Sequence, residues 1–112
     1  MPLFIVTDEV SLSASGSDSL VFDVSRGERV TINRMGFVST GNFKITEIKD
    51  TASGYRFLSG SIYNDQLKQN NGNVFDFPIP ITLEGPTKLV IEVTDTSGSS
   101  NNVRVALYGS KE

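Results

Sequence analysis

The sequence predicts an all-β protein, an antiparallel β-sandwich or jelly roll of about eight short strands. Val, Ile and Thr together number 28 of the 112 residues, whereas Ala numbers only three, and β-branched side chains favour the pleated surface of a sheet. Clusters of Gly, Pro, Ser and Asn interrupt the chain about every ten residues, and no stretch of eleven residues keeps a helical apolar repeat without such an interruption. Short strands separated by turns at this spacing are typical of sandwiches and jelly rolls.

Alternation of apolar and polar residues places the individual strands. The last two segments are the clearest, because Leu89, Ile91 and Val93 share one face of the first of them. The first two segments are either short strands or an extended arm. In chain order the segments are Leu3–Thr7, Val10–Ala14, Ser19–Val24, Arg29–Val38, Asn42–Lys49, Gly54–Tyr63, Val74–Leu83, Thr87–Asp95 and Asn102–Tyr108.

Three features predict irregular strands. Gly36 interrupts the apolar alternation of its segment, and a slip in the apolar phase of the next segment predicts a bulge near Thr46–Glu47. Pro78 and Pro80 remove two backbone donors from one side of their strand. Because proline cannot donate to a sheet, we expect this strand at an edge or irregular.

Length and apolar content predict one folded domain. Leu, Ile, Val and Phe make up 34 of the 112 residues, well above the roughly 20% below which chains stay disordered. We expect residues 1–15 to form an N-terminal arm or edge strands and residues 16–112 a single β-sandwich domain. The stretches Ala14–Ser19 and Asn64–Asn73 are predicted to be surface loops.

The composition argues against catalysis, metal sites and cofactors. The chain has no Cys and no His, which excludes thiolate ligands, Cys/His zinc sites and every His-dependent triad. Its carboxylates are spread over turns and outward strand faces, and no phosphate-binding glycine loop is present. The loops Asp95–Ser99 and Asn70–Asn73 offer oxygen ligands, but neither matches a calcium loop, so turns without metal are the favoured interpretation. We therefore expect a protein that is not an enzyme and holds no cofactor.

Charge and hydropathy exclude two kinds of partner. The net charge is −3, and neither half of the chain is basic, so direct binding to nucleic acid is not expected. No apolar run reaches the 18 or so residues of a membrane span, and the first residues lack the basic and apolar regions of a secretory signal. The sequence as given predicts a protein made in a cytoplasm.

The remaining signals suggest contacts with other chains. The first segment begins with four consecutive apolar residues, which form either an outer strand of the sheet or a strand added to a neighbouring subunit. A second segment combines aromatic residues and prolines, and a core strand is its simpler interpretation. The candidate contact residues are Leu3, Phe4, Ile5, Val6, Phe75, Phe77, Pro78 and Pro80. The candidate exposed loop residues are Asn64, Asp65, Asn70, Asn71 and Asn73.

Three stretches resemble the small β-sandwich or jelly-roll decoration (cement) proteins and related virion structural proteins of tailed bacteriophages. The first stretch, from Gly41 to Ser59, resembles a strand pair followed by an asparagine-rich loop. The second, Phe77–Val93, resembles their strand–turn–strand, and the third, Asp95–Gly109, resembles their closing strand with its terminal glycine.

This resemblance implies a capsid decoration protein without catalysis. Such a protein is made in the host cytoplasm, binds the major capsid protein on the outer surface of the virion, and stabilises the shell through symmetric contacts as a trimer or dimer. The alternative function is a carbohydrate- or receptor-binding β-sandwich module of a phage fibre or cell surface. Its support is the Asn/Ser-rich loops, with Tyr55, Tyr63 and Tyr108 as candidates for stacking on a sugar ring.

Overall fold

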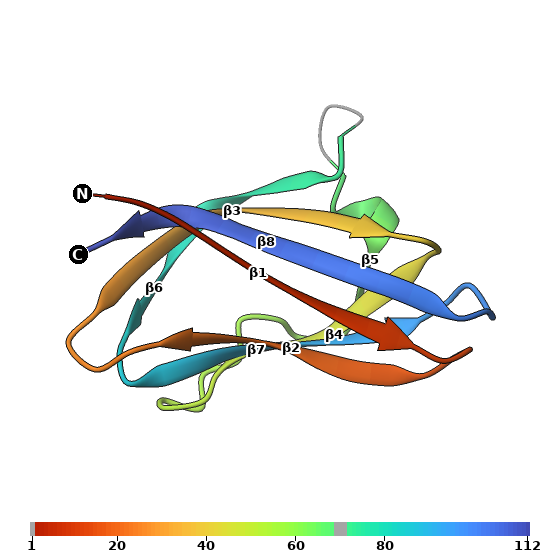
Figure 1. The fold of residues 1–112 in the computed structure, drawn as a ribbon, viewed down its shortest axis with the longest axis horizontal. Coiled ribbons are helices and arrows are strands. Elements are labelled where there is room, and N and C mark those ends of the chain that lie inside the picture. The colour runs from red at the N-terminus through yellow and green to blue at the C-terminus, as the bar shows by residue number, and fades with distance from the viewer. Residues whose placement is uncertain (1, 69–71) are drawn as a thin grey trace.

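The structure is a computed structural model that describes residues 2–68 and 72–112. Two four-stranded antiparallel sheets face each other (Figure 1). Sheet A has the strand order β1-β8-β3-β6, and sheet B has the order β2-β7-β4-β5. The strands are β1 (Leu3–Leu12), β2 (Ser17–Val24), β3 (Arg29–Ser39), β4 (Phe43–Asp50), β5 (Ile62–Tyr63), β6 (Val74–Glu84), β7 (Thr87–Asp95) and β8 (Asn101–Lys111), and one 3-10 turn, η1, spans Asn64–Gln66.

The pairing of strands is that of a jelly roll. β1 pairs with β8, β2 with β7, β3 with β6 and β4 with β5, all antiparallel. The chain therefore forms one long double-stranded hairpin that is rolled so that alternate strand pairs enter opposite sheets. This arrangement confirms the predicted fold class. It also places both ends of the chain side by side, at the left of Figure 1, because β1 and β8 are neighbours.

The core lies between the two sheets and follows the period-2 pattern. Twenty apolar residues are buried there, and β7 and β8 alternate buried and less buried residues along most of their length. Close to the loop that joins β3 to β4, Phe43 packs edge-to-face on Phe37, with ring centroids 5.6 Å apart. Rings in this geometry stabilise the core beyond the area that they bury.

A bulge in β3 reverses which face its residues occupy. The pairing of β3 with both neighbours shifts between Ile32 and Arg34, so Val30 and Ile32 point inward before the bulge while Met35 and Phe37 point inward after it. The break in apolar phase thus lies at Asn33, and the prediction that it lies at Gly36 was wrong, because Gly36 continues the new phase as a paired residue of β3.

Gly109 allows β8 to pass this bulge. It lies opposite Ile32, and a Cβ atom on Gly109 would lie 1.8 Å from the carbonyl oxygen of Thr31. No side chain fits at that distance, so the close approach of the two backbones requires glycine at this position.

Two other predicted irregularities are confirmed. The pairing of β4 with β7 shifts between Ile45 and Glu47, which is the expected bulge. β6 is an edge strand of sheet A, and it pairs with β3 on either side of an unpaired stretch, residues 77–80, that contains both prolines.

Several predicted boundaries were wrong. Only Ile62–Tyr63 of the segment Gly54–Tyr63 is a strand, and one isolated bridge joins Arg56 to Lys49. The first two predicted segments form the single strand β1, and β2 already begins at Ser17, inside a predicted loop. Within the described ranges no helix is long and apolar enough to cross a membrane.

Candidate interaction surface

The N-terminal half of β1 is an open sheet edge. Lys111 donates its backbone N–H to the carbonyl of Pro2, so even-numbered residues of β1 face β8 with their backbone groups, and the backbone groups of Leu3, Ile5 and Thr7 face away from it. The side chains of Leu3 and Ile5 are 77% and 52% exposed. Phe4 and Val6 point inward and are half-buried against the core.

The other half of β1 is closed by a carboxylate. Asp8 occupies an inward position between Val6 and Val10, where the alternation calls for an apolar residue. One of its oxygens accepts the N–H of Glu9 at 2.9 Å, and the other accepts the N–H of Val21, on the neighbouring edge strand β2, at 2.9 Å. An inward-pointing charge of this kind blocks pairing with another strand, since it occupies the donors that such a strand would need.

A second inward-facing carboxylate, that of Asp18, binds an edge N–H near the start of β2. Asp18 is in phase with the buried residues of β2, and its carboxylate accepts the N–H of Ser19 at 2.8 Å. The side of the sandwich where β1 and β2 meet is therefore closed along the Asp8 and Asp18 region.

The opposite edge of sheet A is β6, which is closed differently. Gly85 donates its N–H to the backbone carbonyl of Glu28 on β3's side of the strand. Continuing the alternation from there directs the nitrogen of Pro80 to the free side. A proline at such a position presents no donor to an added strand. Between the two prolines, the side chain of Ile79 is 82% exposed, while Phe75 and Phe77 pack on each other and on the core.

The outer face of sheet A joins these two edges. Ile5, Tyr108, Arg34 and Asp76 lie side by side across the four strands. Arg34 donates to Asp76 through Nε at 2.5 Å. This hydrogen bond lowers the pKa of Asp76 and raises the pKa of Arg34, so the pair is charged over the physiological pH range.

A shallow depression, open to solvent, lies next to this row. Its lining includes the small residues Gly36 and Ala106 and the larger residues Thr7, Val38, Val74 and Tyr108. The ring of Tyr108 lies against Gly36, since a Cβ atom there would be 3.2 Å from it. Tyr108 also borders a second depression on the side of Asn33 and Asp76.

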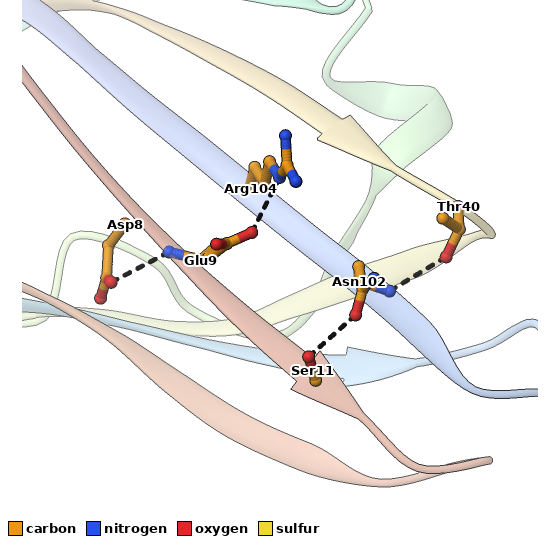
Figure 2. A network of polar contacts seen from close by, with 6 residues as sticks. All are labelled: Asp8, Glu9, Ser11, Thr40, Asn102 and Arg104. Carbon is orange, nitrogen blue, oxygen red and sulfur yellow. Dashed lines mark hydrogen bonds and ion pairs between the residues drawn. The ribbon is translucent and has the colours of Figure 1, made fainter.

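Polar contacts hold β1 and β8 together from the border of the depression towards the end of β1 (Figure 2). Arg104 of β8 donates to Glu9 of β1 at 2.8 Å, and Ser11 donates its hydroxyl to Asn102 at 2.8 Å. The N–H of Asn102 in turn donates to the hydroxyl of Thr40 at the end of β3. These contacts anchor the half of β1 that Asp8 closes.

The loops at that end of the sandwich meet on Asp95. Its buried carboxylate accepts five hydrogen bonds, from the Ser97 hydroxyl and N–H, the Ser15 and Gly98 N–H groups, and the Asn101 amide. The hydrogen bonds from Ser97 and Ser15 hold the pKa of Asp95 well below its usual range. Both oxygens that a cation would use are thus directed at protein donors, and in the described ranges no group of three or more His, Cys, Asp or Glu side chains is placed to hold a metal.

The predicted loop residues have different environments. The prediction that Asn64 is exposed was wrong, because Asn64 is buried and accepts the N–H of Phe43 at 3.0 Å. Asp65 and Asn73 are exposed, and Asn70 and Asn71 lie outside the described residues. An Asn/Gln-rich composition could not distinguish an amide that binds a backbone from one that faces solvent.

The predicted contact segments lie on the two edges of one sheet. Leu3, Ile5, Pro78 and Pro80 are exposed, whereas Phe4, Val6, Phe75 and Phe77 pack against the core. Ile79 lies in the predicted contact segment Phe75–Ile81 but was not among the residues singled out there. Sequence reasoning missed Asp8 and the outer-face row in which Tyr108 lies between Ile5 and Arg34. Asp8 had a readable signal, since it is an acid in the apolar phase of its strand.

Comparison with known proteins does not assign this chain to a family. No family model and no curated protein matches it. Among solved structures, the chain is similar to the Drosophila NLP core, whose structure is described as providing insight into pentamer formation and histone binding. The two share 17% identity over 96% of this chain and 98% of the other, with a TM-score of 0.43.

Proposed function

We propose that this protein is a virion structural protein, a capsid decoration (cement) protein that binds the major capsid protein on the outer shell and involves no catalysis. One observation carries the proposal. The two segments that the sequence singles out for contacts with other chains, at the start of β1 and in the middle of β6, form the two edges of the same sheet. Both edges expose large apolar side chains, Leu3 and Ile5 on one and Ile79 on the other.

This arrangement suits a protein that joins neighbours. A subunit with an apolar contact surface on each edge of one sheet can bind two neighbouring subunits at once, through two small interfaces. Many symmetric copies acting together then stabilise a shell, because the second contact of each copy forms at a high effective concentration. Binding to the assembled shell and not to free subunits shifts the equilibrium towards assembly, in accordance with linkage.

Co-sedimentation with capsid shells tests the proposal. Purified protein is mixed with shells of the phage that encodes it, prepared without this protein, and we expect saturable binding and a higher temperature of shell disruption. Ile79→Ser and Leu3→Ser should each weaken binding, whereas Val38→Ser, at an exposed apolar residue in the middle of the sheet, should not. Absence of binding by the unmodified protein would refute the decoration role.

One observation favours the alternative of a carbohydrate- or receptor-binding module. Tyr108 lies between two shallow depressions whose linings include Glu9, Arg104, Asn73 and Asp76, and sugar sites combine an aromatic face with polar groups of this kind. A glycan array should then show specific binding that Tyr108→Ala abolishes and Tyr63→Ala, on sheet B, leaves intact. No binding to any glycan would leave this alternative without support.

A further inference from the structure

We infer that residues 3–7 of β1 pair with the same residues of a second copy, antiparallel about a two-fold axis at Ile5. This deepens the proposed function by assigning one of its symmetric subunit contacts, yet the pairing itself is a property of the protein alone. The inference starts from the open edge of β1, where the backbone groups of Leu3, Ile5 and Thr7 face away from β8.

The other edges that the structure describes do not offer the same opportunity. Asp8 and Asp18 take the edge donors where β1 and β2 approach each other. Prolines interrupt the free side of β6, and β5 is only two residues long. In Figure 1, β1 and β2 meet at the right and separate towards the N-terminus, so β2 leaves the start of β1 accessible.

The open segment is complementary to itself. With the axis at Ile5, Leu3 lies opposite Thr7 of the second copy and Phe4 lies opposite its Val6. Leu3, Ile5 and Thr7, whose backbone groups face away from β8, form about six backbone hydrogen bonds with the second copy. Pairing stops at Glu9 because its N–H already donates to Asp8. The inward pairs match an aromatic with a β-branched side chain, which is a favourable cross-strand pair.

Charge and burial favour a second copy as the occupant. Residues 2–7 carry no charged side chain, although 21% of the whole chain is charged, so the segment matches an uncharged strand such as itself. Pairing places the two copies of Ile5 side by side, and each is flanked on its other side by the Tyr108 of its own copy, its neighbour on β8. It also covers the exposed part of Phe4 and Val6, which the core leaves half-buried.

Single-cysteine cross-linking tests the register. The chain has no cysteine, so Ile5→Cys introduces one thiol per copy, and two such residues facing each other across the axis lie within disulfide range. We expect Ile5→Cys to form a covalent dimer on mild oxidation. Val38→Cys, exposed to a similar degree in the middle of the same face, is the matched control and should stay monomeric.

Two further variants exclude random collision. Leu3→Cys alone should not cross-link, because its symmetry mate is four residues along the strand, about 13 Å away, whereas a mixture of Leu3→Cys and Thr7→Cys should. Equal cross-linking of Leu3→Cys alone and of the mixture would overturn the register. Equal cross-linking of Ile5→Cys and Val38→Cys would overturn the site.

Sedimentation velocity of the cysteine-free protein tests the association itself. Because a contact of five residues per copy is small, we expect weak and reversible association, with the dimer detectable when the protein concentration is raised to about 1 mM. Ile5→Lys sets two like charges opposite each other and should raise the dimer Kd at least about tenfold, while Val38→Lys should leave it unchanged. A protein that stays monomeric at 1 mM, or an effect equal for both variants, would refute the dimer. Shell binding by such a monomer would still support the decoration role, and a dimer without shell binding would refute that role alone.

Discussion

The two ends of the sandwich differ in how their backbone groups are hydrogen-bonded: polar side chains bind them at one end, and at the other end those of β1 are open on one side. At the loop end, at the right of Figure 1, the connections after β1, β3 and β7 and the turn η1 lie close together. Three polar side chains, Asp95, Asn101 and Asn64, hydrogen-bond across them: Asp95 to Ser15, Asn101 to Gly41 and Asn64 to Phe43. At the other end the start of β1 has β8 on one side only, and two large apolar side chains are exposed there.

The comparison teaches that openness here is local. β1 is a single strand, but the Asp8 carboxylate divides it into a closed half, which is tied to β2 and β8, and an open half. Buried polar groups must be hydrogen-bonded to be tolerated, and at the loop end they are. At the start of β1 no side chain supplies a partner, and the backbone groups of Leu3, Ile5 and Thr7 stay open on the side away from β8.

The largest effect on stability should come from removing a core side chain at the loop end of the sandwich. Phe43→Ala removes a fully buried ring that contacts Phe37, and we expect a loss of about 3–5 kcal/mol in the free energy of unfolding, measured by urea denaturation. Phe4→Ala, at the open end, should cost clearly less, because Phe4 is only half-buried. Equal losses would mean that the two ends are packed alike.

The next effect concerns the polar network. Asp95→Asn places an amide among backbone donors and should lower the melting temperature. Because the folded pKa of Asp95 is lowered, its contribution is present at neutral pH and is lost as the pH falls from about 5 through the folded pKa. The difference in stability between unmodified protein and Asp95→Asn should therefore shrink in acid. A difference that stays constant down to pH 2 would contradict this role of the carboxylate.

Asp8→Ala should have a smaller effect on stability, but it should increase association between copies. Loss of its two hydrogen bonds should cost about 1 kcal/mol and should extend the open edge of β1 beyond Thr7, so larger assemblies form in sedimentation velocity runs. Asp23→Ala on β2 makes the same change of charge at an exposed, outward position and serves as the control. If Asp23→Ala promotes association equally, net charge and not the edge is responsible.

The smallest effect on stability should come from Ile5→Thr. The residue is half-exposed, and the substitution keeps β-branching, so the free energy of unfolding in dilute solution should change by no more than about 0.5 kcal/mol. A loss above 1 kcal/mol would show that Ile5 belongs to the monomer's core and not to a contact surface.

Much of this fold is predictable from the alternation of side chains. β7 coincides with its predicted range, and the bulge in β4 and the edge position of β6 follow from a phase slip and two prolines. The β3 bulge at Asn33 leaves the same kind of phase slip, since Val30 and Ile32 are followed by Met35 and Phe37 in the other phase, and attributing the break to Gly36 missed it. The prediction of a strand over residues 54–61 failed for another reason: this segment bonds to β4 through a few backbone contacts, including the Arg56–Lys49 bridge and the Phe57 N–H donated to Ile48, and forms no regular ladder.

The candidate site was predictable only in part. Apolar density at Leu3–Val6 and the prolines of β6 identify the two edges, since edges are where such residues affect pairing. The burial of Asn64 depends on a partner 21 residues away, the N–H of Phe43, and no local pattern encodes it. The division of β1 likewise depends on Val21, which only the rolled topology brings to Asp8.

Residue-resolved amide hydrogen exchange of β1, at low and at high protein concentration, tests the central claim most directly. In dilute solution the amides of Ile5 and Thr7 should exchange quickly, while those of Val6 and Glu9, which donate to β8 and to Asp8, should be protected. At high concentration Ile5 and Thr7 should become protected as well. Protection of these two amides that is the same at both concentrations would contradict the claim that this half of β1 is a sheet edge open to a second copy.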